Sequence, residues 1–416
     1  MMTSDLADAK DPTTAFVWIW LPGATEPVVC GRLDDDARRI SFSYAASYLV
    51  RSDALPIYEP ELALQRGPQF SLDGARLPLC IDDAMPDSWG RRLVNLRLGE
   101  PTAEFGELTY LLASGSDRIG ALDFQDSPTD YVPREADHPS LDDLANAAAR
   151  VEEGADLDPT LMAALLRGTS IGGARPKALL DGPVGGLIAK FSSATDTYPV
   201  VQGEFVAMEL ASRAGINAAT VELTRAVGRH ALLVHRFDRD TTGCRRRVVS
   251  ALTLLGLNTF PSGRYATYPQ LADQIRARFT EADSTLHELF ARISFNILCG
   301  NTDDHGRNHA AYLREDGLAL TPAYDLCPQA RSGGTAAQAM AYGREGQRES
   351  RIAPLLDSAG TYHLERSSAA DLVEQQIAVI NSNWQDVCDH AELTRAERAA
   401  FMGRQFLNPF ALGSGI

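Results

Sequence analysis

The chain has 416 residues, of which 44% are hydrophobic and 23% charged, so it can form two or three domains with sizeable cores and is not a disordered chain. Its formal net charge of −16 argues against unaided binding to nucleic acid, because such binding depends on a basic surface. The six cysteines lie far apart and show no C-x-x-C spacing, which indicates reduced cytosolic thiols.

The beginning of the chain does not resemble a targeting signal. Residues 1–14 are acidic and polar, whereas a secretory signal starts with basic residues and continues with an apolar stretch. Elsewhere in the sequence no apolar run approaches the ~20 residues that span a bilayer. We therefore expect a cytoplasmic protein without membrane contact.

Residues 1–125 are predicted to form a β-rich N-terminal subdomain. Apolar residues in alternation and turn residues between them indicate strands at residues 15–21, 28–33, 40–44 and 119–124. Helices are expected to begin near Met85 and to cover residues 107–113. The following residues 125–139 are rich in Asp and Pro, which predicts a linker.

Residues 140–238 are predicted to be the nucleotide-binding part of an N-terminal lobe. Ser140 opens an S-x-x-D capping signal, so a helix is expected over residues 141–151. Strands at Lys177–Leu180 and Leu187–Phe191 are expected to form a hairpin. The loop before this hairpin consists of Ser170, Ile171, Gly172, Gly173 and Ala174.

Glycine loops and strand lysines both suit phosphate binding. Consecutive glycines let backbone N–H groups approach phosphate oxygens, and Lys190 on the second hairpin strand can pair with the α- and β-phosphates of a nucleotide. The same glycines could also form an ordinary turn. A helical pattern that opens at Glu204 and includes Glu209 follows, and either carboxylate could orient Lys190 or be solvated.

Residues 239–416 are predicted to form a mainly helical C-terminal lobe. The clearest apolar helical patterns cover residues 286–299, 369–380 and 395–406. The first of these helices leads directly into a polar loop that carries the chemistry. Residues 331–350, with many Gly, Gln, Ala and Arg residues, are expected to form a mobile insertion.

The loop from Asn301 to Asn308 carries the most specific chemical signal. Asp303 lies five positions before Asn308, which is the spacing of a kinase catalytic loop, where the Asp accepts the substrate hydroxyl proton and the Asn oxygen holds Mg²⁺. Asp325 can supply a second hard oxygen ligand, since Mg²⁺ keeps waters and phosphate oxygens as its remaining ligands. The spacing therefore favours phosphoryl transfer.

A different metal site in the same loop has to be considered. Asp303, Asp304, His305 and His309 are residue types that bind zinc or iron, so they could form a transition-metal centre instead. Asp and Asn side chains also cap backbone amides in ordinary turns. These alternatives predict a dependence on zinc, or no metal dependence, in place of a dependence on magnesium.

Several separated motifs together resemble the HipA family of serine/threonine kinases, the toxin components of bacterial toxin–antitoxin pairs. The resemblance rests on S-x-G-G-A-R-P-K at residues 170–177, I-A-K-F at 188–191, H-R-F-D-R at 235–239, N-T-D-D-H-G-R-N at 301–308 and P-A-Y-D-L at 322–326. It implies an α+β, protein-kinase-like bilobed fold with a β-rich N-terminal subdomain, an ATP-binding lobe and an all-helical C-terminal lobe.

The resemblance also implies roles for individual residues. Asp303 matches the catalytic aspartate, and Asn308 and Asp325 match the Mg²⁺ ligands. Ser170 matches the serine on which members of the family phosphorylate themselves. The residues implied to contact ATP are Ser170, Ile171, Gly172, Gly173, Ala174, Lys177, Lys190, His235, Phe237, His305, Asn308 and Asp325. His235 stands where many members have an acidic residue, which leaves the side-chain contact at that position open.

The family further implies partners. These are a small helix-turn-helix antitoxin of the HipB type, operator DNA reached only through that antitoxin, and a cytosolic protein substrate such as an aminoacyl-tRNA synthetase. Competing hypotheses are a kinase-shaped but inactive binding module that acts as a co-repressor with the antitoxin, and a small-molecule kinase. Intact Asp303, Asn308, Asp325 and Lys190 argue against the inactive module, because a scaffold has no physical need for all four.

Overall fold

A computed structural model describes residues 11–134, 139–155, 157–169, 171, 175–182, 185–258, 263–331 and 334–413. The chain forms two compact units, and each has its own core. The N-terminal unit comprises Met1–Ala194, Ala226–Arg229 and His235–Val249, and the C-terminal unit comprises Thr195–Arg225, His230–Val234 and Ser250–Ile416.

An antiparallel sheet begins the N-terminal unit, with strand order β3-β2-β1-β4. Its strands are β1 (Thr14–Ile19), β2 (Val28–Asp35), β3 (Ile40–Tyr44) and β4 (Leu122–Gln125). Apolar side chains that alternate along these strands lie in the core and are fully buried: Val17, Leu33, Phe42 and Phe124. The four strands predicted from the alternation are therefore present.

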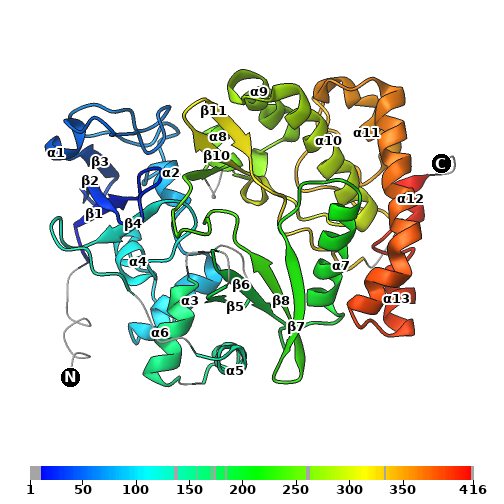
Figure 1. Cartoon of the computed structure of the whole chain (residues 1–416), viewed down its shortest axis with the longest axis horizontal. Helices are drawn as coiled ribbons and strands as arrows, with labels where there is room; N and C mark the ends of the chain where they lie inside the picture. The colour runs from blue at the N-terminus through cyan, green and yellow to red at the C-terminus, as the bar shows by residue number, and fades with distance from the viewer. Residues whose placement is uncertain are drawn as a thin grey trace. The chain divides into compact units, whose positions relative to one another are not determined.

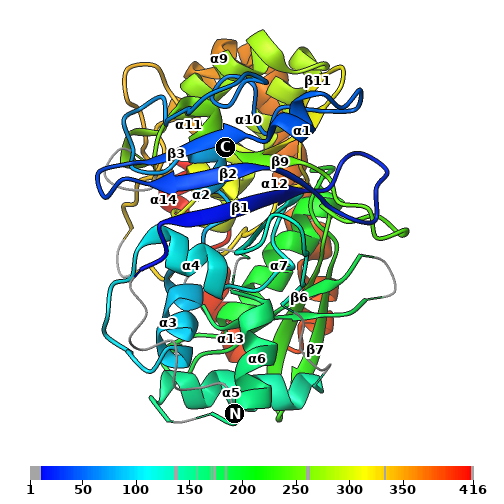
Figure 2. The same ribbon diagram turned by 90° about the vertical axis from the view of Figure 1, so that its left-hand side faces the viewer.

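Helices of the N-terminal unit pack on this sheet and on a later hairpin. They are α1 (Ala46–Leu49), α2 (Leu79–Asp82), α3 (Ser88–Arg97), α4 (Glu107–Ala113), α5 (Leu141–Glu152) and α6 (Pro159–Arg167). Helix α4 packs against β1 and β4, and Figure 2 shows it next to β1. The predicted capping signal of α5 is confirmed, because Ser140 and the third residue of the helix form a reciprocal capping box.

The predicted hairpin is also present. Strands β5 (Lys177–Leu180) and β6 (Leu187–Phe191) pair antiparallel, and α5 and α6 pack against β5. The expected linker after β4 is not a free segment. Tyr131 packs its ring 5.3 Å from that of Trp18, and its hydroxyl donates to Asp123 at 3.1 Å, so this part of the linker is attached to the sheet.

Helices dominate the C-terminal unit, as predicted. Its longer helices are α7 (Val200–Arg213), α9 (Tyr268–Arg278), α10 (Ala282–Cys299) and α12 (Arg366–His390). Helix α12 packs against α7 and α10, and these helices are seen side by side in Figure 1. Shorter helices are α8 (Ala251–Leu255), α11 (Ile352–Asp357), α13 (Arg395–Phe401) and α14 (Pro409–Leu412). None of the helices in the described part of the chain is long and apolar enough to cross a bilayer.

Strands β7 (Val221–Ala226) and β8 (Arg229–His235) lie within residues 140–238 and are hydrogen-bonded neighbours. Strands within residues 239–416 correct the expectation of an all-helical C-terminal lobe: β9 (Val248–Ser250), β10 (Ala310–Arg314) and β11 (Gly317–Leu320). Strands β10 and β11 form an antiparallel hairpin that follows residues 301–309. Two residues connect the strands of this hairpin. Gly317, which follows them, has φ +135°, a conformation that glycine adopts readily because it has no Cβ.

The expectation of a mobile insertion over residues 331–350 is wrong for much of the described segment. Gln338, Met340, Ala341 and Tyr342 are buried. The backbone N–H of Ala339 donates to the carbonyl of Thr302 at 3.0 Å, so the segment is bonded to the residue before Asp303. Its polar composition concealed these backbone contacts, which no periodicity in the sequence reveals.

Candidate functional site

The loop that contains Asp303 starts where α10 ends. Gly300 terminates the helix in the left-handed conformation with φ +72°, and a Cβ at this position would lie 2.7 Å from the carbonyl oxygen of Gln405. Glycine is therefore required both by the backbone angle and by the close approach. The turn directs the chain from the buried end of α10 into residues 301–309.

A buried polar network holds this loop. The Asp304 carboxylate accepts hydrogen bonds from the Tyr268 hydroxyl, from Asn296 Nδ2 at 2.7 Å and from His309 Nε2 at 2.8 Å. Asn301 Nδ2 donates to Asn296 Oδ1 at 3.0 Å. All five of these side chains are buried. The start of the loop is thus tied to α10 through Asn296, and the Asp304 carboxylate joins the end of the loop to α9 and α10.

The environment of Asp304 keeps its carboxylate ionised. Burial alone would raise the pKa of Asp304, but the neighbouring His309 and the hydrogen bonds from His309 and Tyr268 outweigh burial and hold this pKa below its ordinary value. Tyr268 responds in the opposite direction: burial and then the Asp304 charge raise the pKa of its hydroxyl well above its ordinary range. Tyr268 therefore stays a proton donor.

This geometry weakens the transition-metal alternative. The Asp304 oxygen that would face a metal already accepts three protein donors, and His309 is one of them. His305 is exposed. Within the described residues no group of three or more His, Cys, Asp or Glu side chains could hold a metal ion.

Asp303 and Asn308 have the exposure that their predicted roles require. Asp303 is exposed, whereas Asn308 is only 8% exposed and lies in the short 3₁₀ turn Gly306–Asn308. Asn308 Nδ2 donates to the Asp303 carbonyl at 3.4 Å. The amide nitrogen is therefore directed back into the loop, which orients the side-chain oxygen as a potential metal ligand.

Two hydrogen bonds join the Asp325 segment to the loop over residues 301–309. Asn301 Nδ2 donates to the Asp325 carbonyl at 3.4 Å, and the Tyr324 hydroxyl donates to the Arg307 carbonyl at 2.6 Å. Asp325 itself has φ +62°, an uncommon conformation for a residue other than glycine that is enriched at functional sites. The two predicted Mg²⁺ ligands thus belong to segments that are bonded to each other.

The N-terminal unit brings the two predicted lysines together. Lys177 on β5 and Lys190 on β6 are directly opposite in the antiparallel pair, so their side chains leave the same face of the hairpin. Lys177 is 2% exposed, and its Nζ lies 3.1 Å from Asp87 Oδ2. Lys190 is partly exposed.

Most of the predicted glycine loop lies outside the described residues: Ser170, Gly172, Gly173 and Ala174. Ile171 is described and partly exposed. Arg167, at the end of α6, has its guanidinium 2.6 Å from Asp181 and 3.7 Å from Asp117. A phosphate on the loop would therefore have to compete with two carboxylates for this arginine.

The segment of residues 235–239, in which His235 and Phe237 are predicted to contact ATP, has two distinct faces. His235 and Phe237 are partly exposed, whereas Arg236, Asp238 and Arg239 are buried. This alternation leaves His235 and Phe237 as the residues of the segment that could contact a ligand.

The buried face of this segment forms a charge network that the sequence did not predict. Arg236 lies 2.8 Å from Asp117 and 2.9 Å from Asp238, and Arg239 lies 2.9 Å and 2.8 Å from the same two carboxylates. Burial raises the pKa of Asp238, but Arg236 and Arg239 outweigh it and lower this pKa to about 2. The R-F-D-R run thus also stabilises the N-terminal unit through buried ion pairs.

The two glutamates considered as partners of Lys190 differ in their surroundings. Glu204 is 3% exposed near the start of α7, whereas Glu209 pairs with Arg213 at 3.1 Å on the surface of the same helix. A buried carboxylate requires compensation by donors, and a surface pair does not. Glu204 is therefore the better candidate for a functional carboxylate.

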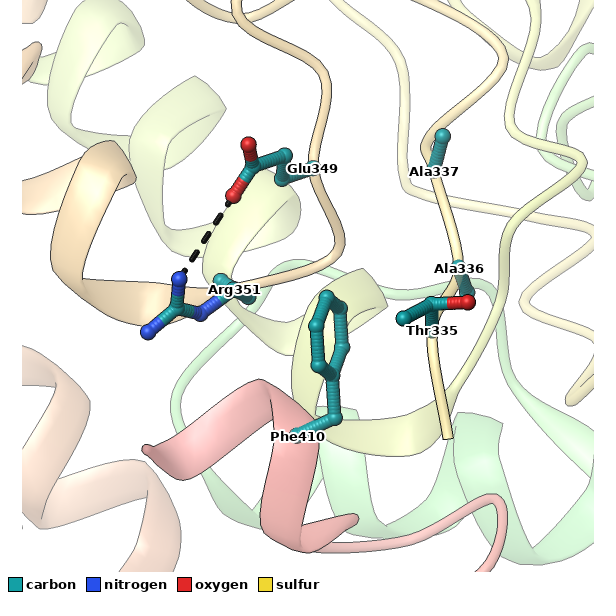
Figure 3. Close-up of a pocket in the computed structure, with 6 residues that line it drawn as sticks. All are labelled: Thr335, Ala336, Ala337, Glu349, Arg351 and Phe410. Atoms are coloured by element: carbon teal, nitrogen blue, oxygen red, sulfur yellow. Dashed lines mark ion pairs between the residues drawn. The ribbon is translucent and has the colours of Figure 1, made fainter. Parts of the chain in front are cut away.

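A surface groove of the C-terminal unit is lined by none of the predicted site residues. Its volume is about 580 Å³, and its lining consists of Thr335, Ala336, Ala337, Glu349, Arg351 and Phe410. Figure 3 shows the Phe410 ring between Arg351 and the 335–337 backbone, with the guanidinium 5.5 Å from the ring centroid. Glu349 lies 3.7 Å from Arg351, so the charge in the groove is balanced.

Sequence reasoning missed Tyr268, Asn296, Asn301 and Asp87. Asn296 could have been identified from the sequence, because it is a polar residue in the otherwise apolar helical pattern of residues 286–299. Tyr268 and Asp87 could not, since their partners lie 36 and 90 residues away in the chain.

Known proteins resemble this chain over most of its length. Residues 24–125 match the HipA N-terminal domain, and residues 169–384 match the HipA-like C-terminal domain. The putative kinase Y4mE of Sinorhizobium fredii is 28% identical over 344 residues, which are 76% of this chain and 77% of that protein. The serine/threonine-protein kinase toxin HipA of Shewanella oneidensis is 30% identical over 145 residues, which are 30% of this chain and 34% of the toxin.

A solved structure shares the fold. It is the complex of HipA, HipB and operator DNA from Shewanella oneidensis MR-1, with a TM-score of 0.67 and 21% sequence identity. The match covers 90% of this chain and 92% of the solved chain. The predicted α+β fold of the HipA type is thereby confirmed.

Proposed function

Because this chain belongs to the HipA family of serine/threonine kinases, we propose that it transfers the γ-phosphate of ATP to a protein hydroxyl, with Mg²⁺ as the required metal ion. The observation that carries this proposal is the pair of bonds from Asn301 to Asp325 and from Tyr324 to Arg307. They join the D-x-x-x-x-N loop to the second acidic segment, as a phosphoryl-transfer centre needs.

Asn308 and Asp325 would hold the magnesium ion. An amide oxygen and a carboxylate are hard ligands, and Mg²⁺ needs few protein ligands because it keeps waters and phosphate oxygens. The orientation of Asn308 supports this role, since its Nδ2 atom is used in a hydrogen bond to the Asp303 carbonyl. When bound, the ion neutralises charge on the β- and γ-phosphates.

Asp303 would orient the attacking hydroxyl and accept its proton. Its exposure supports this role, because a substrate side chain can reach the carboxylate. The buried Asp304 beside it holds the loop and is not available to substrate. Exposed Asp303 would therefore act on the substrate, whereas buried Asp304 would only support the loop.

Lys177 and Lys190 would bind the phosphates together with the amides of the loop over residues 170–174. Their opposite positions in the β5–β6 pair support a shared task, because two ammonium groups on one face attract an anion. His235 and Phe237 would contribute the side chains that line the nucleotide, and His305 would add a polar contact.

Ser170 would be the site of self-phosphorylation and an inhibitory switch. A phosphate adds about −1.5 to −2 charges, which would repel bound ATP if the loop stayed in place. Arg167 could hold the phosphate elsewhere, although it is engaged with Asp181 and Asp117 in the present structure. The switch would then exchange one set of ion pairs for another.

The partners would be those that the family implies. The related toxin was solved with HipB and operator DNA, and the acidic charge of this chain fits contact with DNA only through a basic helix-turn-helix antitoxin of that type. The substrate would be a cytosolic protein such as an aminoacyl-tRNA synthetase.

The experiment that tests the proposal combines a labelled nucleotide with a host lysate. Purified chain is incubated with γ-labelled ATP and Mg²⁺, and the labelled protein and residue are identified by mass spectrometry. We expect label on Ser or Thr of one or a few proteins, with magnesium required. Transfer that needs zinc in place of magnesium would favour the metal centre of His305 and His309 and contradict the proposal.

A further inference from the structure

The first turn of α3 contacts the start of β5. Asp87 caps α3, where its Oδ1 accepts the backbone N–H of Gly90 at 2.8 Å. Its other oxygen, Oδ2, lies 3.1 Å from Lys177 Nζ. One carboxylate therefore fixes a helix start in the N-terminal subdomain and, at the same time, the ammonium group of a predicted nucleotide-binding lysine.

Two further contacts fasten the backbone on both sides of the glycine loop. Trp89 Nε1 donates to the carbonyl of Lys177, three residues after the end of the loop, at 3.3 Å. Gly90 packs against Thr169, directly before the loop, so closely that a Cβ would lie 2.1 Å from the Thr169 carbonyl oxygen. Residues 87–90 thus hold both ends of the segment that carries Ser170.

The charge balance at Lys177 requires a partner of this kind. Lys177 stands opposite Lys190 in the hairpin, and like charges directly opposite destabilise a strand pair. The Lys177 side chain is 3% exposed, so water cannot compensate its charge, whereas that of Asp87 is 18% exposed. Asp87 supplies the negative charge and fixes the direction in which the lysine points.

We propose that Asp87 is a positioning residue that holds Lys177 for the nucleotide phosphates, so that α3 of the N-terminal subdomain takes part in nucleotide binding. The inference rests on the proposed role of Lys177 in phosphate binding. The subdomain then sets the position of the Lys177 ammonium group, and it does so through Asp87.

The variant Asp87→Asn separates the charge from the helix cap. Asparagine caps a helix about as well as aspartate, so α3 keeps its start while the negative charge of Asp87 beside Lys177 is removed. Binding of Mg²⁺ and the ATP analogue AMP-PNP to the full chain is measured by titration calorimetry. We expect affinity to fall on the order of tenfold to a hundredfold, the usual cost of removing the group that orients a ligand-binding side chain.

A matched control is Asp158→Asn. Asp158 caps α6 and accepts the N–H of Thr160 at 2.9 Å, so the same chemical change is made at another helix start of the same unit. Its affinity for the nucleotide should equal that of the wild type. Asp87→Glu keeps the charge and should retain affinity within a few-fold.

A double-mutant cycle tests whether Asp87 acts through Lys177. In a Lys177→Met background, Asp87→Asn should cause no additional loss of AMP-PNP affinity, because its effect is transmitted by the missing ammonium group. An equal additional loss in both backgrounds would overturn the proposal, as would wild-type affinity of Asp87→Asn. Equal losses for Asp87→Glu and Asp87→Asn would overturn it too.

The result can be separated from failure of the proposed function. If the wild type does not bind AMP-PNP with Mg²⁺, the kinase proposal and this inference fall together. If the wild type binds and Lys177→Met weakens binding while Asp87→Asn does not, only the inference is refuted. Thermal melting checks folding. Should Asp87→Asn not fold, Asp87→Ser also caps a helix and removes the charge, and unchanged affinity there would refute the inference.

Discussion

Replacing Tyr268 by phenylalanine should loosen the catalytic loop without disturbing the core. The hydroxyl donates to the buried Asp304 carboxylate, and the ring is fully buried. A hydrogen bond to a charged group contributes about 1.5–3 kcal/mol. Asp304 keeps two other donors, Asn296 and His309, so we expect a loss of about 2 kcal/mol, near the middle of that range.

The assay is native-state hydrogen exchange of the amides in residues 301–309. If the free energy of local opening of the loop falls by about 2 kcal/mol, these amides exchange about 30-fold faster. The Asn308 amide is informative, because it donates to the His305 carbonyl at 2.8 Å within the loop. Phosphoryl transfer should slow at the same time, since Asp303 and Asn308 lose their fixed positions.

Tyr362→Phe is the matched control. Tyr362 is also fully buried in the C-terminal unit, but its hydroxyl donates to the neutral carbonyl of Tyr342 at 2.6 Å. Its removal should cost about 1 kcal/mol and leave exchange in residues 301–309 and phosphoryl transfer unchanged. Equal effects of the two substitutions on the loop would refute the positioning role of Tyr268.

Four other outcomes are expected. Asp325→Asn should raise the Mg²⁺ concentration for half-maximal transfer at least about tenfold, and an unchanged requirement would exclude it as a ligand. Asp238→Asn should lower the free energy of unfolding at pH 7 by about 3 kcal/mol. Because the wild-type carboxylate has its pKa lowered to about 2, its stabilisation is present above the ordinary value of 3.8 and is lost as the pH falls through 2, so the variant's urea stability should depend less on pH there than the wild type's. Ser170→Ala should abolish self-phosphorylation seen by peptide mapping, and the phosphorylated wild type should bind ATP more weakly; undiminished affinity would defeat the switch. In a mobility-shift assay, operator DNA should be retarded only when the helix-turn-helix partner is added, and tight salt-sensitive binding by the chain alone would contradict this.

Local patterns in the sequence were sufficient to propose candidate reacting groups. The spacing of Asp303 and Asn308 is short, so one loop determines their relation and a motif can reveal it. The β5–β6 hairpin is local as well, and its register places Lys177 opposite Lys190. The Ser140 cap of α5 was readable for the same reason.

Groups that support the site could not be predicted, because their partners are distant in sequence. Asp87 meets Lys177 across 90 residues, and Asp117 meets Arg236 across 119. Such pairs follow from the packing of whole elements, and a pattern within one element does not record them. The expectation of a mobile loop at residues 331–350 was wrong for a related reason. The backbone hydrogen bond from this segment to Thr302 cannot be predicted from amino-acid composition.

The measurement that tests the central claim most directly compares the wild type with Asp303→Ala in transfer of labelled phosphate from ATP in the presence of Mg²⁺. The fold should be intact by circular dichroism, because Asp303 is exposed and contributes no core packing. We predict a rate about 10²- to 10⁴-fold lower, the contribution of a positioned general base. A folded Asp303→Ala variant with a rate near that of the wild type would contradict the assignment of this loop as the phosphoryl-transfer centre.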